Sequence, residues 1–475
     1  MYVEKVKLKL TKQQYYQLNK TFFIAYKIYV ICTKYAQKQL RLLYKNKRYK
    51  YLIYLYGKYK QINEIYPYTN ELKEIINLYD LNKTKLEKYL KVQGKKYKHI
   101  LTSTQVQCIA DTVAKAIDKC LYGKGKNIHI KKFNDFNVIN QKTFNGFKYN
   151  GYDLYFLKDK YRLKCNKKYN QEDISTLVLK RIEFNSGYEY YINFILKSTQ
   201  PKRITSGNSE CGIDTGVSIE AIVTDKNCIL EELAPRCKEY NKKIARLQKQ
   251  LDISVRSTNK VNSDGTFIKG IKLKYSKHAK YLKRKIRVLY RKKSAYTNCM
   301  HRRLANKIIK ECNIIKIEPI DFNSLAKRSK NLERSEKESN IVDSKGNKIH
   351  KYKKRKRFGK SINDRSPGLF IKILENKSKL YEVELIKINR YKVKASQYNH
   401  KTDEYEKHKL SERMKLIGTD IVQRDLYSAF LIKNTNNDII DKDKCNYEYK
   451  QFLDNQEKEI TRIKNAGIRN KNFGF

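Results

Sequence analysis

The chain of 475 residues lacks two patterns that would narrow its class. Its ten cysteines are scattered between Cys32 and Cys445 without a CxxC pair, which argues against a disulfide framework or a cysteine zinc site. No apolar run approaches the roughly 18 residues that a membrane span needs, and Met1 precedes the charged stretch "YVEKVKLKL" rather than a signal peptide. We therefore expect a cytoplasmic protein in a reducing compartment, with no membrane partner.

Acidic residues are scarce relative to basic ones. Lys and Arg number 105 against 48 Asp and Glu, a formal net charge of +57, so the protein would repel itself unless a polyanion screens it. Codon bias could enrich lysine without any binding role, and a basic surface also suits anionic lipid. Codon bias does not explain arginine-bearing clusters such as "KYKKRKR" (351–357) and "KYLKRKIRVLYRKK" (280–293), so nucleic acid is the favoured partner.

The length and the changing sequence pattern suggest about three domains. A capping box formed by Thr11 and Gln14 predicts a helix, and helical spacing continues with breaks to about Gly123. Short β-type runs then extend to about Lys202. The third region alternates a strand hairpin, helices, a strand, a helix and another strand, which is typical of an α/β fold. We expect the residues from about Asn434 onward to form a mobile tail, because they contain few apolar anchors.

Three acidic residues stand at the ends of predicted elements in this third region. Asp214 lies in "CGIDTGVSIEAIVTD", where alternating apolar residues predict a strand hairpin with Gly216 at the bend. Glu318 ends the predicted strand "NIIKIE", at the edge where open α/β sheets place ligands. Asp425 lies in "VQRDLYSAFLI", in the first turn of a predicted helix.

Each acid alone has a structural explanation. An Asp near a Gly is usual in turns, a Glu after a strand is usually solvated, and the helix dipole favours an Asp in a first turn. If the three ends converge, however, three like charges need a counterion, and a divalent metal ion meets that need. Two Mg²⁺ ions held by such carboxylates would activate water and stabilise the leaving oxygen of a phosphodiester.

The ordered set "GIDTGVSIEAIVTD", "IIKIEPIDF" and "VQRDLYSAFLI", separated by a lysine-rich helical stretch, resembles the split RuvC nuclease of TnpB-type (OrfB) insertion-sequence proteins. These proteins are related to type V CRISPR effector nucleases. The resemblance spans roughly Tyr2 to Lys433. It implies that Asp214, Glu318 and Asp425 are the catalytic, metal-binding residues and that Mg²⁺ or Mn²⁺ is the cofactor.

The implied fold is an α/β RNase H-like (RuvC) nuclease domain, with an N-terminal helical recognition domain inserted into a small wedge β-barrel. The expected segments are the first strand of the wedge barrel (1–10), the helical recognition domain (11–123), the wedge β-barrel (124–205), the RuvC-like nuclease with motifs one and two (206–394), a degenerate zinc-ribbon-like insertion (395–420), the third RuvC-like motif (421–433) and the tail (434–475). The implied activity is RNA-guided cleavage of DNA. The implied partners are a guide RNA derived from the element end and double-stranded target DNA, with a companion transposase as a further possibility. An RNA-guided protein reads mainly backbone and shape, which suits abundant lysine.

Two departures from the family pattern stand close to Asp425. The usual four zinc-binding cysteines are missing from "ASQYNHKTDEYEKHKLSERMKLIGTDIVQRD", and His400 and His408 are the only remaining candidate ligands. Two histidines alone make a poor structural zinc site, so we do not expect structural zinc. Tyr427 stands where the family commonly has Asn.

Two other functions remain open on the sequence. The protein could be an RNA- or DNA-binding regulator whose nuclease is weak or inactive. It could also be a strand-transferring transposase of the acidic-triad kind, which shares the fold class. A tyrosine-dependent transposase is disfavoured, because the closest match to its His-hydrophobic-His metal pair, "NIHIKK", contains only His129.

Overall fold

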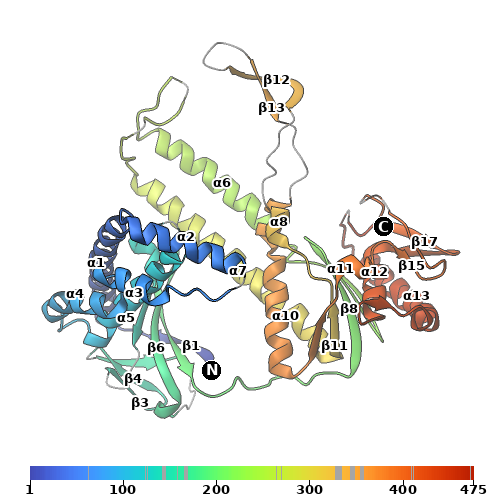
Figure 1. Cartoon of the computed structure of the whole chain (residues 1–475), viewed down its shortest axis with the longest axis horizontal. Helices are drawn as coiled ribbons and strands as arrows, with labels where there is room; N and C mark the ends of the chain where they lie inside the picture. Colours follow the sequence, from blue (N-terminus) through green and yellow to red (C-terminus); the bar gives the residue numbers. More distant parts are fainter. Residues whose placement is uncertain are drawn as a thin grey trace. The chain divides into compact units, whose positions relative to one another are not determined.

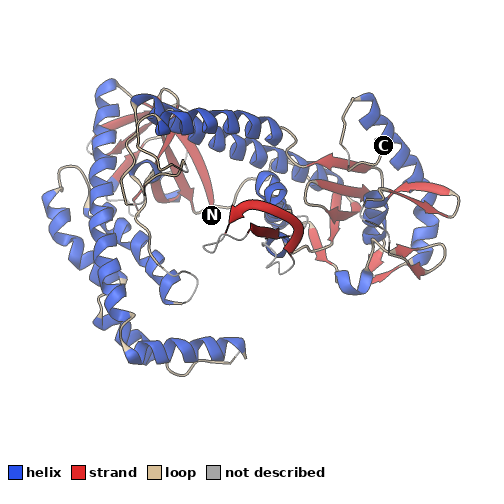
Figure 2. Ribbon diagram, turned by 90° about the horizontal axis from the view of Figure 1, so that it is seen from above, coloured by secondary structure: helices blue, strands red, loops and turns tan. Residues whose placement is uncertain are grey.

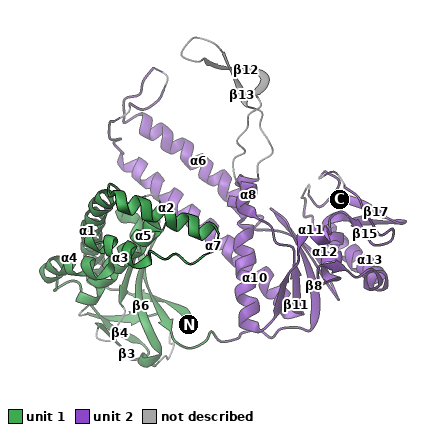
Figure 3. Cartoon of the chain, in the orientation of Figure 1, with its two compact units in different colours: residues 1–200 green, residues 201–475 purple. Residues whose placement is uncertain are grey.

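The protein has a mixed α/β fold that divides into two compact units, residues 1–200 and 201–475 (Figure 3). The computed structural model describes residues 1–62, 64–122, 125, 127–141, 146–157, 159–164, 170–263, 265–268, 270–326, 334–342, 348–352, 358–407, 409, 411–470 and 472–475. His408 and residues 353–357 of the basic cluster lie outside these ranges. Among the described residues, no helix is long and apolar enough to cross a membrane.

Unit 1 is built on a curled sheet with the strand order β2-β6-β7-β1-β5-β4-β3 (Figure 1). Its strands are β1 (Tyr2–Lys9), β2 (Val138–Gln141), β3 (Phe147–Tyr149), β4 (Asp153–Phe156), β5 (Asp159–Leu163), β6 (Ile174–Phe184) and β7 (Gly187–Leu196). Neighbouring strands are antiparallel. The first residues of the chain thus pair with strands that lie more than a hundred residues later in the sequence.

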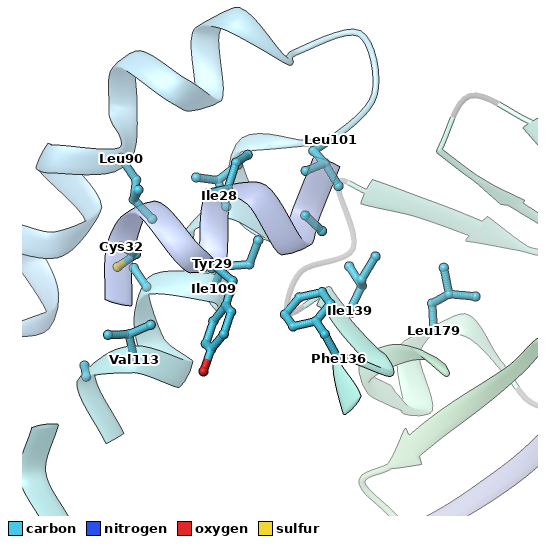
Figure 4. Packing of buried hydrophobic residues seen from close by; sticks show 14 of the residues in the cluster. Ile28, Tyr29, Cys32, Leu90, Leu101, Ile109, Val113, Phe136, Ile139 and Leu179 are labelled. Carbon is cyan, nitrogen blue, oxygen red and sulfur yellow. The ribbon is translucent and has the colours of Figure 1, made fainter. Parts of the chain in front are cut away.

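Along the chain, five helices lie between β1 and the other strands of this sheet. They are α1 (Lys12–Leu43), α2 (Lys47–Gln61), α3 (Thr69–Leu78), α4 (Lys83–Lys96) and α5 (Ser103–Leu121). The predicted capping box is confirmed, because the Thr11 side chain accepts from Gln14 N and the Gln14 side chain accepts from Thr11 N. Apolar faces of α1, α4 and α5 share a core with β2 and β6, where Ile28, Leu90 and Ile139 are among the buried side chains (Figure 4).

Unit 2 contains a five-stranded sheet with the order β10-β9-β8-β11-β14. Its strands are β8 (Ser209–Thr215), β9 (Ile219–Thr224), β10 (Cys228–Glu232), β11 (Cys312–Ile317) and β14 (Glu384–Lys387). The hairpin strands β8, β9 and β10 are antiparallel, whereas β8, β11 and β14 are parallel. The central strand β8 therefore joins the two halves of the sheet.

Helices cover both faces of this sheet. The helices of unit 2 are α6 (Cys237–Arg256), α7 (Lys277–Glu311), α8 (Phe322–Ala326), α9 (Gly359–Arg365), α10 (Pro367–Tyr381), α11 (Arg390–Val393), α12 (Arg424–Lys433) and α13 (Lys442–Asn465). Apolar residues of α7 and α10 pack on one face, together with Ile213 and Ile315. The other face is covered by α12 and α13, which pack against Ala221 and Leu230.

Short hairpins complete unit 2. They are β12 (Arg334–Val342) with β13 (Lys348–Tyr352), β15 (Tyr398–Asn399) with β16 (Glu404–Tyr405), β17 (Met414–Ile417) with β18 (Asp420–Gln423), and β19 (Thr435–Asn436) with β20 (Ile439–Ile440). The β15–β16 and β17–β18 hairpins lie beside α12 and α13 (Figures 1 and 2). They occupy the segment in which a degenerate zinc ribbon was expected.

The predicted disordered tail, 434–475, is not observed, because most of this segment forms β19, β20 and the 24-residue helix α13. Among its few apolar residues, Tyr449, Phe452 and Ile463 are buried in the core that includes α12. Polar side chains supply the rest of the interface. The Gln456 side chain accepts from Gln423 N at 2.7 Å, and the Glu459 carboxylate accepts from Leu230 N at 2.9 Å. Glu459 thereby satisfies a backbone donor on the edge strand β10, where no neighbouring strand can do so.

Candidate active site

The backbone around Asp214 is fixed by two glycines. A Cβ atom at Gly212 would overlap the carbonyl oxygen of Ala429 and the amide nitrogen of Lys433, so helix α12 lies directly on strand β8. A Cβ at Gly216 would overlap the carbonyl oxygen of Ile219, which accepts from Gly216 N at 3.0 Å to close the β8–β9 hairpin. The predicted hairpin at Gly216 is confirmed, and Asp214 lies two residues before its bend.

Glu318 lies next to Asp214 across the parallel pair β8–β11. Ile213 and Ile317 are register partners, and Asp214 and Glu318 are the residues that follow them. The amide of Glu318 also donates to Ile213 O at 3.4 Å, which extends the ladder to the carboxyl ends of the strands. Two of the three predicted acids therefore occupy the same edge of the sheet, where such folds place ligands.

Asp425 approaches this edge from the first turn of α12. The Gln423 side chain caps the helix by accepting from Leu426 N at 2.7 Å. The carboxylate of Asp425 is held by two arginines. Arg424 donates from Nη2 to Oδ1 at 2.7 Å, and Arg413 donates from Nη1 to Oδ2 at 3.4 Å. Both oxygens thus have a cationic partner, in addition to the favourable field of the helix N-terminus.

Asp214 lies within electrostatic reach of the other two acids. Burial raises the pKa of Asp214 well above its ordinary value, and the negative charges of Asp425 and Glu318 raise it further, while Arg424 opposes the rise. Burial also raises the pKa of Glu318, which the charge of Arg390 partly offsets. The residues brought together by the fold are therefore the three that the sequence singled out, together with three arginines that it did not.

These carboxylates are suitable in kind for a hard divalent cation, which prefers oxygen ligands. Among the described residues, however, no group of three or more His, Cys, Asp or Glu side chains is close enough to hold a metal ion. A metal ion bound by Asp425 would compete with Arg413, whose contact with Oδ2 is longer than those that Arg424 makes with Oδ1. The donor chemistry fits such an ion, whereas the positive charges of Arg413 and Arg424 beside Asp425 oppose it.

A fourth carboxylate, Glu220, is buried in the neighbouring strand β9. Its exposed fraction is 0%, and neither side-chain oxygen has a hydrogen-bond partner among the described residues. Burial raises its pKa well above the ordinary value, and the charge of Asp214 adds to the rise. Glu220 pairs with Thr215, whereas Asp214 pairs with Ala221, so the two acids point to opposite faces of the sheet. Sequence reasoning missed Glu220. The alternation of residues along strand β9 places it on the face opposite to Asp214.

The segment in which a degenerate zinc ribbon was expected is held by aromatic packing. His400 is fully buried, and its Nδ1 lies 2.7 Å from the hydroxyl of Tyr427. Burial, reinforced by the charges of Lys401 and Lys442, lowers the pKa of His400 to about 4, so the imidazole is neutral at pH 7. The rings of Phe430 and Tyr449 pack around it. Tyr427 is therefore part of the buried core next to the helix turn that carries Asp425.

Buried ion pairs fix the far end of α12. Lys433 is 3% exposed, and its Nζ binds Asp225 at 2.7 Å and Glu448 at 2.6 Å. Lys316 of β11 is 4% exposed, and its Nζ binds Lys433 O at 2.9 Å and Glu210 at 3.3 Å. These contacts tie α12 to both β8 and β11, the strands that carry or precede the other two acids.

Comparison with known proteins gives only remote structural likeness. No protein-family model matches the sequence, and no curated protein matches it. The chain is similar to a cryo-EM structure of the Cas12f1–sgRNA–target DNA complex, with 13% identity over 90% of this chain and 87% of that chain and a TM-score of 0.39. It is also similar to a cryo-EM structure of a CRISPR–Cas12f ternary complex, with 14% identity, coverages of 90% and 86%, and a TM-score of 0.27. Likeness at this level does not establish a shared function.

Proposed function

We propose that the chain is an RNA-guided, divalent-metal-dependent DNA endonuclease of the TnpB type, with a RuvC-like catalytic domain in unit 2. The observation that supports this proposal most directly is the convergence of Asp214, Glu318 and Asp425 at one sheet edge. These acids come from three segments separated by about a hundred residues each, and they meet in a protein with a net charge of +57. Ionising three neighbouring acids costs free energy unless a cation balances their charge. A phosphodiester substrate, which is an anion, suits the surrounding positive charge.

In this proposal the three carboxylates hold Mg²⁺ or Mn²⁺ and so position the scissile phosphate. The bound metal supplies an activated water and stabilises charge on the leaving oxygen. The chain's own residues orient the site: the Gly212 contact and the buried lysines fix α12, and the ladder between β8 and β11 fixes Glu318. Arg413 and Arg424 supply positive charge beside Asp425, where an anionic phosphate would lie.

A second function is favoured by one observation. Both carboxylate oxygens of Asp425 bind arginine, and no metal-ready group exists among the described side chains. A protein that uses these arginines purely as structural counter-ions would bind guide RNA and target DNA without cutting. That protein would be an RNA-guided regulator with an inactive nuclease.

The two functions are separated by one experiment. The chain is purified from its host with any RNA that accompanies it, the RNA is sequenced, and cleavage of a matching DNA duplex is measured in Mg²⁺. We expect one discrete RNA species, and we expect Asp214→Asn, Glu318→Gln and Asp425→Asn each to reduce cleavage more than about 100-fold. Glu384→Gln removes an exposed carboxylate from β14 and serves as the matched control. Binding without cleavage by the unmodified complex would favour the regulator, and random RNA would refute guidance.

A further inference from the structure

The segment formed by residues 472–475 lies against the candidate active site, and we call it the strap. Asn472 makes two side-chain contacts there. Its Oδ1 accepts from Arg413 Nη2 at 3.4 Å, and its Nδ2 donates to Ser218 Oγ at 3.4 Å. Ser218 belongs to the β8–β9 hairpin just beyond Asp214, and Arg413 binds Asp425. A single side chain therefore links the segment that carries Asp214 to the arginine on Asp425.

The strap is anchored on both sides of this contact. Phe473 is 1% exposed and is part of the core that α12 and α13 share. Gly474 has φ +91°, and a Cβ atom there would lie 2.5 Å from the Cβ of Arg413. The strap thus packs on the Arg413 side chain so closely that only glycine fits. Two independent features, a polar contact and a steric fit, locate the strap on the same arginine.

Arg413 is constrained from the opposite side as well. Arg424 N donates to Arg413 O at 2.9 Å, so the backbones of the two arginines pair at the base of the β17–β18 hairpin. The Arg413 side chain is 25% exposed, and its guanidinium lies between Asp425 Oδ2 and Asn472 Oδ1. A guanidinium remains charged at every accessible pH, so Arg413 opposes the binding of a metal cation to Oδ2 as long as it stays beside that oxygen.

We infer that Asn472 is a positioning residue which, with Gly474, holds Arg413 on Asp425 and thereby raises the divalent-metal concentration that the site requires. This inference rests on the proposed function only for the identity of the bound cation. The contact is long and partly exposed, so its influence on metal affinity should be modest. The partly exposed Arg413–Asp425 ion pair, which Asn472 supports, corresponds to about a two- to five-fold change in affinity at most.

The test measures Mn²⁺ binding to the full chain by the shift in melting temperature with metal concentration, without any nucleic acid. Asn472→Ala and Gly474→Ala should each lower the apparent Kd for Mn²⁺ by about two- to five-fold. Gly467→Ala is the matched control, because Gly467 also has a positive φ, +61°, but no atom lies within 4 Å of its Cβ position. It adds the same backbone strain without touching Arg413 and should leave the Kd unchanged.

A double substitution separates positioning from general damage. In the Arg413→Gln background, Asn472→Ala should produce no further change in Kd if Asn472 acts through Arg413. Three results would each overturn the inference. Asn472→Ala could change the Kd fully in the Arg413→Gln background, it could leave the Kd unchanged in the otherwise unmodified chain, or Gly467→Ala could shift the Kd equally.

The outcome remains decisive if the proposed function fails. Should the unmodified chain show no Mn²⁺-dependent shift, the metal-dependent nuclease is refuted, and the inference about metal demand falls with it. The free energy of urea unfolding without metal then tests whether the Asn472–Arg413 contact exists. Coupling between Asn472→Ala and Arg413→Gln supports the strap as a holder of Arg413, and strict additivity refutes it.

Discussion

Replacing Glu220 with glutamine should stabilise unit 2 at neutral pH. Glu220 is fully buried with no partner for either oxygen among the described residues, so burial raises its pKa and favours the protonated carboxyl in the folded protein. The unfolded chain ionises the same group above its ordinary pKa of about 4.5. Glutamine is nearly isosteric with the neutral carboxyl group but cannot ionise, so the substitution removes only the pH-dependent cost.

The magnitude follows from proton linkage. Above the unfolded-state pKa, the folded state binds one more proton than the unfolded state, so its stability falls by about 1.36 kcal/mol for each pH unit. The loss ends where pH passes the raised pKa of the folded state. If that limit lies above pH 7, Glu220→Gln should gain up to about 3.4 kcal/mol at pH 7, about 2 kcal/mol at pH 6 and nothing at pH 4. The gain at pH 7 corresponds to a melting temperature about 10 °C higher.

The assay is thermal and urea unfolding of both proteins from pH 4 to pH 8, followed by circular dichroism. Glu231→Gln is the matched control, because Glu231 faces Glu220 on β10. Burial raises its pKa as well, but the charges of Lys307 and Arg303 oppose that rise, so its pH dependence should be weaker. Parallel pH profiles for the unmodified protein and Glu220→Gln would refute the reasoning, as would a less stable Glu220→Gln at pH 7.

Three further predictions concern the region around the acids. Because the pKa of Asp214 is raised and a bound metal needs the carboxylate form, Mn²⁺ affinity should increase as pH rises from 6 to 8; a flat profile would argue against Asp214 as a ligand. Phe430→Ala should lower the free energy of unfolding by about 3–5 kcal/mol, because this ring is 1% exposed and its centroid lies 4.7 Å from that of Phe452. The control Tyr391→Ala, at a site 72% exposed, should change the same free energy by less than about 0.5 kcal/mol. Urea unfolding measures both. His400→Ala should lower the free energy of unfolding by about 1–3 kcal/mol, because the Tyr427 hydroxyl loses its Nδ1 partner and keeps only its contact with the backbone amide of residue 400. A chelator should not lower the melting temperature, and a metal analysis that found bound zinc would contradict this account.

Local signals in the sequence predicted the elements that position the acids. The capping box at Thr11, the bend at Gly216 and the first-turn placement of Asp425 each depend on residues within four positions of one another. The convergence of Asp214, Glu318 and Asp425 was not a local signal. Only the ordered set of motifs suggested it, since spacing along the chain does not determine which strand ends meet.

The partners of Asp425 could not be predicted in the same way. Arg413 reaches the carboxylate because the β17–β18 register pairs its backbone with Arg424, and such a register depends on the turn and on packing. The helix α13 was missed for a different reason. Gln456 and Glu459 are buried because they bond to strand backbones elsewhere in the unit, and a sequence pattern counts such residues as solvent-facing.

The absence of a side chain at Gly212 has a consequence for local unfolding of unit 2. Since α12 rests on the β8 backbone with no side chain between them, we expect the two elements to open together. They form a single cooperative unit of local unfolding, and its opening free energy is shared by Asp214 and Asp425. We therefore expect Asp214 and Asp425 to lose and regain their positions together when this part of unit 2 opens.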